Sequence, residues 1–396
     1  VSIKILVIIL RIHTRRFIHI KEAFTFLCFQ FPKMMAPKDN FAVLLAVILV
    51  SYFSIALEEN VRIAEYNSRG HQWPPRDEEF IPNTEGWKTI FRRRFEQVNA
   101  IEDSNDRYNA YMSAVHQALL SKNFTENGWG LTKAPQTLVE ELQKNLMNGL
   151  ENQPKFEGTP ACIETDNDPY FISQSDLNYR AMHELLPLHE AWSGVKLIPN
   201  NAYGLRVYRN NSSLNMHVDK SETHIISSIL HVDHDKDSEP WPLVIEDFNG
   251  NTVEVFLEAG DMLFYESSKC SHGRPRKFQG SWYSSLFIHY YPEDWPKELK
   301  MDTHYRVPPS WNTHIKVDEL ENLPEKLIQV DTSMKEHGCE HEWCGLKNSI
   351  EVTGPAPGYG KVLSAGGIVT ELQNIPSEES LLNESKERHR LEKEEL

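Results

Sequence analysis

The sequence predicts a mostly β domain, built as an antiparallel sandwich or jelly-roll barrel, preceded by an α-helical region. Apolar residues recur at helical spacing before residue 155, and after Pro160 they alternate with polar ones. Asn-Gly and Gly-Asp pairs punctuate the alternating part, as turns between short strands do. With 396 residues, 40% of them hydrophobic, the chain is long enough to bury a sizeable core. We therefore expect one main domain with flanking segments.

The N-terminal part reads as leader and translocation segments. Residues 1–33 carry six basic residues and one acid and form a doubtful leader ahead of Met34. Residues 34–57 contain an apolar run from Phe41 to Leu57, whose 17 residues fall between a signal-peptide core and a minimal membrane span. We expect a signal peptide cleaved after Ala56, with an uncleaved signal anchor as the alternative. Membrane association is expected only in the second case.

The charge of the chain argues against a nucleic-acid partner. The formal net charge is −16, and the basic leader works against that figure, so the remainder is more acidic still. A protein that binds nucleic acid by neutralising phosphates needs the opposite balance.

Residues 58–155 are expected to form the helical region. Three groups of apolar residues lie at helical spacing there, and we interpret them as core or packing surface rather than as a cofactor site. The groups are Trp87, Ile90, Phe91 and Val98; Tyr108, Met112, Val115 and Leu119; and Leu138, Leu142, Leu146 and Leu150.

Residues 156–300 are expected to form the β domain. Many short strands with no helical stretch between them favour a sandwich or a jelly-roll barrel. Residues 301–375 are expected to be a C-terminal extension, to which the sequence assigns no function. The candidate strands are 202–209, 213–219, 223–232, 241–247, 251–259, 261–267 and 281–291.

Residues 376–396 are expected to be a charged, disordered tail. The tail ends in KEEL, which resembles the tetrapeptide that returns proteins to the endoplasmic reticulum. Together with a translocation signal, this predicts a location in the lumen of that compartment; the alternative is a single-pass membrane protein with a lumenal catalytic domain. Four glycosylation sequons are compatible with this location, at Asn123, Asn210, Asn211 and Asn383.

Two cysteines lie close together in the stretch HGCEHEWCG. Cys339 and Cys344 are expected to form a short-loop disulfide, the usual state in an oxidising compartment. A zinc site with His337 and His341 is the alternative, although the spacing is not that of a familiar zinc finger.

A candidate metal site lies in the stretch LNMHVD. Residues two apart in a strand face the same way, so we expect His217 and Asp219 to point from one face. Two histidines and one carboxylate form the facial triad of non-haem iron oxygenases, and His272, just after the candidate strand 261–267, can supply the third ligand. A second pair, His231 and Asp233, precedes an acidic loop and is interpreted as a strand histidine beside a solvated turn.

Three segments carry a resemblance to a known family: YGLRVYRNNSSLNMHVDKSETHIISSILHV, EAGDMLFYES and HGRPRKFQGSWYSSLFIHYYPEDW. They resemble the catalytic domain of prolyl 4-hydroxylase-type iron(II)/2-oxoglutarate-dependent dioxygenases, over roughly 203–295. The resemblance implies a double-stranded β-helix fold and iron ligands at His217, Asp219 and His272, and it leaves His231 outside the site. It also implies iron(II), 2-oxoglutarate and dioxygen as cofactor and cosubstrates, with ascorbate as a further candidate.

One feature departs from the family pattern. The family binds the distal carboxylate of 2-oxoglutarate with a Lys or Arg about ten residues after the distal histidine, where this chain has Ser281 and Trp282. We expect Arg274, together with Tyr208, to take that role. The alternative for Arg274 is an exposed basic turn.

These observations predict an iron(II)- and 2-oxoglutarate-dependent dioxygenase that decarboxylates 2-oxoglutarate to succinate. The acceptor is expected to be a peptide or protein, prolyl or another residue, or another molecule of the secretory pathway. Because the usual cation is missing, the alternative is a non-catalytic jelly-roll module of the endoplasmic reticulum that binds metal or a partner. A membrane-tethered scaffold that uses the helical region is a third reading.

Overall fold

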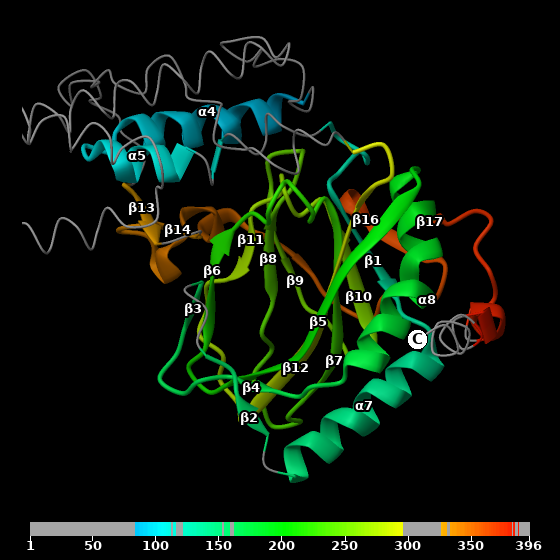
Figure 1. Ribbon diagram of the computed structural model, residues 1–396. Coiled ribbons are helices and arrows are strands. Elements are labelled where there is room, and N and C mark those ends of the chain that lie inside the picture. The colour runs from blue at the N-terminus through cyan, green and yellow to red at the C-terminus, as the bar shows by residue number, and fades with distance from the viewer. Residues whose placement is uncertain are drawn as a thin grey trace, which may run out of the picture. The chain divides into compact units, whose positions relative to one another are not determined.

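The computed structural model describes residues 84–295, 326–384 and 387, apart from short gaps at 112–113, 116–121, 153, 159–161, 331–332 and 382. The described part is built on two large β-sheets, with helices packed against each of them (Figure 1). This confirms the mostly β, jelly-roll class expected from the sequence. The leader, the apolar run 41–57 and KEEL lie outside the described residues.

The described helices are α4 (Glu85–Asn99), α5 (Ser104–Tyr111), α7 (Gln136–Glu151) and α8 (Ser175–Ser193), with short 3-10 helices at Glu340–Glu342, Cys344–Asn348 and Ala365–Gly367. The first nine strands are β1 (Trp129–Lys133), β2 (Lys155–Phe156), β3 (Ile163–Glu164), β4 (Tyr170–Phe171), β5 (Leu197–Arg209), β6 (Ser213–His217), β7 (Ile226–His234), β8 (Leu243–Glu246) and β9 (Thr252–Val255). The others are β10 (Asp261–Tyr265), β11 (His272–Arg274), β12 (Trp282–Pro292), β13 (Leu327–Val330), β14 (Ser333–Glu336), β15 (Ile350–Val352), β16 (Lys361–Ser364) and β17 (Ile368–Glu371).

The larger sheet has the order β17-β16-β1-β10-β7-β12-β5-β4-β2, and the smaller has β13-β14-β6-β11-β8-β9-β15. Nearly all pairings are antiparallel, as hairpin-rich jelly rolls require, while β15 joins β9 in parallel. The apolar residues on the inner faces of the two sheets pack together, with Ile229 and Leu263 from the larger sheet meeting Ile245 and Val253 from the smaller. The interior between the sheets is therefore a true core, in which polar groups need partners.

Helices α7 and α8 cover the outer face of the larger sheet (Figure 1). Helix α7 buries Leu138, Leu142 and Leu146, which recur every four residues as expected from the sequence. Each such side chain contributes roughly 1.5–3 kcal/mol when it leaves water. This packing fixes the larger sheet as a rigid wall behind the interior.

Helix α8 was not expected, because the sequence after Pro160 was interpreted as strands only. Its buried residues nevertheless follow helical spacing, at Ala181, Leu185 and Leu188. The expected change to period two at Pro160 is therefore wrong for residues 175–193, where the helical pattern is interrupted by polar residues and Pro187.

The sheets extend on both sides of the range 156–300. Strand β1, which precedes this range, pairs with β10. Two strands that follow the range also join the sheets: β14 pairs with β6, and β15 pairs with β9. The disulfide expected between Cys339 and Cys344 is confirmed, and the zinc alternative is not needed. The start of the tail is not free either, since Leu381 is buried in the core beneath α7 and α8.

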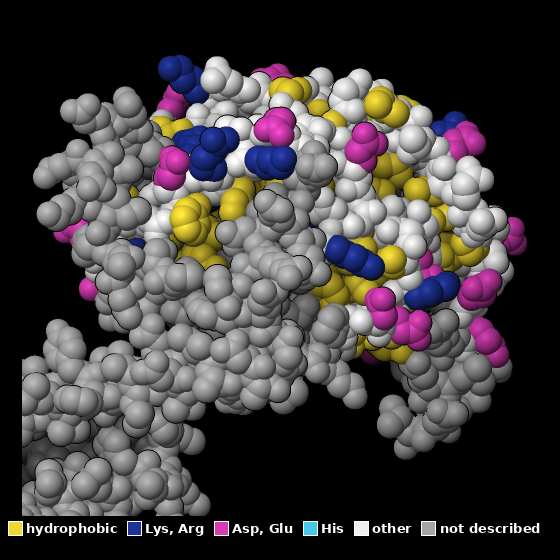
Figure 2. Space-filling model, turned by 90° about the horizontal axis from the view of Figure 1, so that it is seen from above, with side chains coloured by type: hydrophobic (Ala, Val, Ile, Leu, Met, Phe, Trp, Pro, Cys, Tyr) yellow, Lys and Arg dark blue, Asp and Glu magenta, His cyan; other side chains and the backbone are white. Residues whose placement is uncertain are grey.

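Among the described residues, no helix combines the length and the apolar character needed to cross a bilayer. On the face shown in Figure 2, basic and acidic side chains lie interspersed and form no patch of one sign.

Candidate functional site

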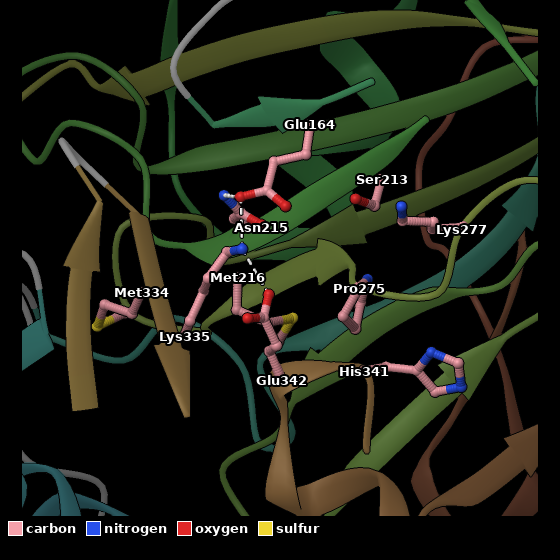
Figure 3. A pocket seen from close by; sticks show the side chains of 10 residues that line it. All are labelled: Glu164, Ser213, Asn215, Met216, Pro275, Lys277, Met334, Lys335, His341 and Glu342. Atoms are coloured by element: carbon pink, nitrogen blue, oxygen red, sulfur yellow. Dashed lines mark hydrogen bonds and ion pairs between the residues drawn. The ribbon is translucent and has the colours of Figure 1, made fainter. Parts of the chain in front are cut away.

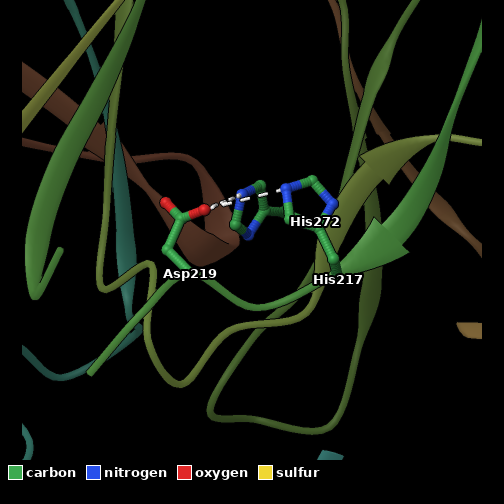
Figure 4. Close-up of side chains that lie close together, drawn as sticks. All are labelled: His217, Asp219 and His272. Atoms are coloured by element: carbon green, nitrogen blue, oxygen red, sulfur yellow. Dashed lines mark ion pairs between the residues drawn. The ribbon is translucent and has the colours of Figure 1, made fainter. Parts of the chain in front are cut away.

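The triad expected from the sequence is brought together at the junction of β6 and β11. These strands pair antiparallel, with His272 directly opposite His217. Asp219 lies in the loop that follows β6, not in the strand as expected, and its backbone N–H donates to the carbonyl of Ser267 (2.8 Å). This bond holds the loop so that the Asp219 side chain turns back toward the two histidines (Figure 4).

The two imidazoles share one carboxylate oxygen as their nearest anionic neighbour. Nε2 of His217 lies 3.7 Å and Nε2 of His272 lies 3.9 Å from Oδ1 of Asp219. Ligand atoms of all three residues lie within 4.8 Å of one another. The two N···O distances are too long for hydrogen bonds, so the three groups converge without satisfying one another.

Backbone carbonyls fix the tautomer of both histidines. Nδ1 of His217 donates to the carbonyl of Asn215 (2.8 Å), and Nδ1 of His272 donates to the carbonyl of Cys270 (2.9 Å). With Nδ1 protonated, each Nε2 carries the lone pair and faces Asp219. Metal-binding histidines are oriented by the same kind of outer hydrogen bond.

Burial keeps both imidazoles neutral. It lowers the pKa of His217 to about 4, assisted by the charge of His272, and it lowers the pKa of His272 to about 4. Burial also raises the pKa of Asp219, and the charges of His217 and His224 partly offset this rise. At neutral pH the imidazoles are thus unprotonated, the state in which histidine binds a metal.

The donor set fits a first-row transition metal. Two imidazole nitrogens and one carboxylate on one side of an ion make a facial triad, which leaves the remaining positions open. In addition, Oδ2 of Asp219 is buried and accepts no hydrogen bond from the described residues; the nearest histidine nitrogen is Nδ1 of His289, at 3.7 Å. A cation among the three groups would compensate the buried carboxylate charge.

Arg274 lies on β11, two residues after His272, and is 2% exposed. The exposed basic turn considered for it is therefore wrong. Gly273 makes this position possible, because a Cβ there would come within 2.8 Å of the carbonyl oxygen of Leu214 on β6. The close approach of the two strands carries Arg274 into the interior.

The guanidinium of Arg274 has polar partners but no acid. It donates to the carbonyl of Trp241 and to the hydroxyl of Tyr283 (3.0 Å), and it lies over both aromatic rings. No carboxylate of the described residues lies within 4 Å of it. A buried guanidinium without an anion is costly, so the site is suited to an anionic ligand.

Arg206, a second arginine close enough to act on the triad, is already paired. Its guanidinium binds both oxygens of Glu157, through Nε (2.8 Å) and Nη2 (2.7 Å). Its Nη1 reaches the hydroxyl of Tyr208 at 3.5 Å, and the charges of Arg206 and Arg274 both act on Tyr208. Tyr208 is buried between the two cations, as a cosubstrate ligand would need to be.

The position where the family has its cation is occupied differently. Trp282 packs against the core beneath α7 and α8, on the side of β12 that faces away from the interior. Its neighbour Tyr283 points inward and contacts Arg274 instead. Cys270 lies two residues before His272, but its thiol points to the carbonyl of Gly128 (3.7 Å), and only its own carbonyl contacts a residue of the triad.

His231 lies deeper in the protein than was expected for a strand histidine beside a solvated turn. It is fully buried, its ring stacks on Tyr283 with centroids 4.1 Å apart, and its Nε2 lies 2.8 Å from Nδ1 of His234. It is outside the triad, as the resemblance implied. Its burial depends on Tyr283, which reaches it from β12.

No protein-family model matches the chain, and no curated protein matches it. Among solved structures, the chain is similar to a prolyl-4-hydroxylase from Pseudomonas putida, at 16% identity over 42% of this chain and 94% of that one, with a TM-score of 0.34. It is also similar to a prolyl hydroxylase from Trichoplax adhaerens in complex with a peptide fragment of the hypoxia inducible factor oxygen degradation domain, at 11% identity over 56% and 99%, with a TM-score of 0.35. A third is a 2OG-Fe(II) oxygenase family oxidoreductase from Burkholderia pseudomallei, at 12% identity over 48% and 92%, with a TM-score of 0.33. These likenesses are distant.

Proposed function

We propose that the protein is an iron(II)- and 2-oxoglutarate-dependent dioxygenase. The observation that carries the proposal is the convergence of His217, Asp219 and His272, with both Nε2 lone pairs directed at one carboxylate. Iron(II) held there would supply the activation of dioxygen, which no side chain achieves alone. The residues of the chain keep the ligands oriented, unprotonated and shielded from water.

The second part of the site is the anion-binding position at Arg274. We assign it to the distal carboxylate of 2-oxoglutarate, because its guanidinium is buried, is without an acid and follows His272 by two residues on the same strand. Tyr208 and Tyr283 carry hydroxyls beside it that can donate to the same carboxylate. Oxidative decarboxylation to succinate would follow, coupled to hydroxylation of the acceptor.

The acceptor is proposed to be a peptidyl residue, prolyl or another, of a protein in the secretory pathway. The resemblance of the three sequence segments supports the peptidyl class. The apolar run 41–57 and the Cys339–Cys344 disulfide support the lumen of the endoplasmic reticulum, an oxidising compartment. If the run is an uncleaved anchor, the catalytic domain would be tethered on the lumenal side.

The proposal is tested without knowledge of the acceptor. The purified protein is loaded with iron(II) without oxygen, and the visible charge-transfer absorbance is recorded as 2-oxoglutarate is added; succinate is then measured after oxygen is admitted. We expect a saturable band and slow succinate formation, both absent in His217→Ala and retained in His183→Ala, a half-exposed histidine of α8. Bound iron with neither band nor succinate would contradict an oxygenase and favour the non-catalytic metal-binding module.

A further inference from the structure

A cavity of about 290 Å3 lies on the smaller sheet, away from the triad, between β3, β6, β14 and the disulfide loop 339–344 (Figure 3). It shares no residue with the triad or with the Arg274 position. Its wall includes ionic side chains of both signs, and its apolar part is formed by Met216, Met334 and Pro275. Both methionines are buried, and thioethers adapt well to apolar groups of different shape.

One wall of the cavity is anionic. Nζ of Lys335 lies 2.5 Å from Oε1 of Glu164 and 2.5 Å from Oε2 of Glu342. Two carboxylates thus contact one ammonium directly, and the more distant charge of Lys277 also acts on Glu164. Among the described residues, Oε2 of Glu164 and Oε1 of Glu342 accept no hydrogen bond, so an additional cationic group can bind there.

The backbone brings Glu342 to this wall in an unusual conformation. His341 and Glu342 have φ values of +52° and +56°, in the left-handed region that residues other than glycine rarely occupy. Such a conformation persists only where its surroundings enforce it, and it clusters at binding sites. Here the disulfide between Cys339 and Cys344 closes the loop around the two residues. The fold thus maintains a strained turn at residues 341–342, and this turn places Glu342 beside Lys335.

The opposite wall offers donors. Lys277 is exposed, and no ion pair joins it to a described acid; Figure 3 shows it across the cavity from Lys335, on the same side as His341. Ser213 also lines the cavity. A serine hydroxyl can donate a hydrogen bond to an anion.

We propose that this cavity binds a free α-amino acid with an apolar side chain. Its ammonium group meets the open oxygens of Glu164 and Glu342, its carboxylate meets Lys277 and Ser213, and its side chain lies on the two methionines. A ligand of one charge matches only one wall, whereas a zwitterion matches both. The inference is independent of the proposed oxygenase activity.

The test is calorimetric titration of the metal-free, full-length protein with L-leucine. We expect saturable binding, weakened at least tenfold for 4-methylpentanoate, which lacks the amine, and for isoamylamine, which lacks the carboxylate. Glu342→Gln and Lys277→Gln are each expected to weaken L-leucine binding about tenfold, the loss of one charge-assisted contact. Glu351→Gln and Lys347→Gln, exposed residues outside the cavity, serve as matched controls and should bind as the parent does.

The absence of saturable binding by L-leucine would overturn the inference. So would binding that is unchanged in both cavity variants, or binding of the two single-charge analogues as tight as that of L-leucine. Lys277 is exposed, so Lys277→Gln is expected to fold normally, and its thermal unfolding midpoint should equal that of Lys347→Gln. Because metal and 2-oxoglutarate are absent from the titration, failure of the oxygenase proposal leaves this result unaffected.

Discussion

Replacement of Arg274 by methionine should remove most of the affinity for 2-oxoglutarate. Methionine keeps much of the volume of the side chain, while a buried guanidinium that pairs with no acid of the described residues is lost. A carboxylate bound to a buried guanidinium gains about 3 kcal/mol from charge-assisted hydrogen bonds, so the Kd should rise roughly 150-fold. Arg274→Lys keeps the charge without the planar fork, and a rise of about tenfold is expected.

The measurement is the anaerobic iron(II) titration with 2-oxoglutarate, followed by visible absorbance at saturating iron. Arg276→Met is the matched control: this arginine lies two residues further on, is 38% exposed and binds Glu254, so its Kd should change less than about twofold. Thermal unfolding of each variant shows that the fold is retained. An unchanged Kd in Arg274→Met would refute the assignment, and a large loss in Arg206→Met instead would transfer the role to Arg206.

Three further predictions concern stability. Arg94→Met should lower the free energy of unfolding by about 3–5 kcal/mol in urea denaturation, because it leaves the buried Glu246 without its cation and Glu336 with Arg93 alone. The exposed Arg92→Met should change little. Burial lowers the pKa of His189 to about 3, so below pH 6.5 the unfolded chain binds a proton that the folded chain does not, and the free energy of unfolding falls as the pH falls. His189→Leu should therefore remove about 2 kcal/mol of the decrease in unfolding free energy between pH 7 and pH 5. An unchanged pH dependence would contradict this. Leu142→Ala should cost about 2–5 kcal/mol, and a midpoint equal to the parent's would mean that α7 is not tightly packed on the sheet.

The triad could be predicted because its signal is local. His217 and Asp219 are two residues apart, and His272 follows a recognisable strand, so the sequence identified all three before any contact was known. The prediction missed that Asp219 follows the strand rather than belonging to it, because the loop geometry depends on a hydrogen bond to Ser267, far along the chain. Arg274 lies in the interior because Gly273 permits close packing of β11 on β6, and its role toward 2-oxoglutarate stays a prediction.

The parts that could not be predicted depend on distant segments. Nothing near β1 indicates that it will pair with β10, more than a hundred residues later, and the same holds for β14 beside β6. The helix α8 did carry a signal, in the spacing of Ala181, Leu185 and Leu188, but its polar residues and Pro187 weakened it. Burial of His231 likewise depends on Tyr283, which reaches it from β12.

The pairing of β14 with β6 has a consequence for synthesis of the protein. Strand β3 pairs with the start of β6, whereas its C-terminal end, with the first candidate metal ligand His217, lies opposite Ser333. That end gains its second neighbour only after 116 further residues have been made, and until then it presents an unpaired edge, which is a site for mispairing with other chains. Contacts of such sequence separation form slowly, and they leave intermediates exposed during folding. A nascent chain stopped before residue 333 would therefore be expected to need a chaperone to protect this edge, even though all three residues of the triad had already been translated.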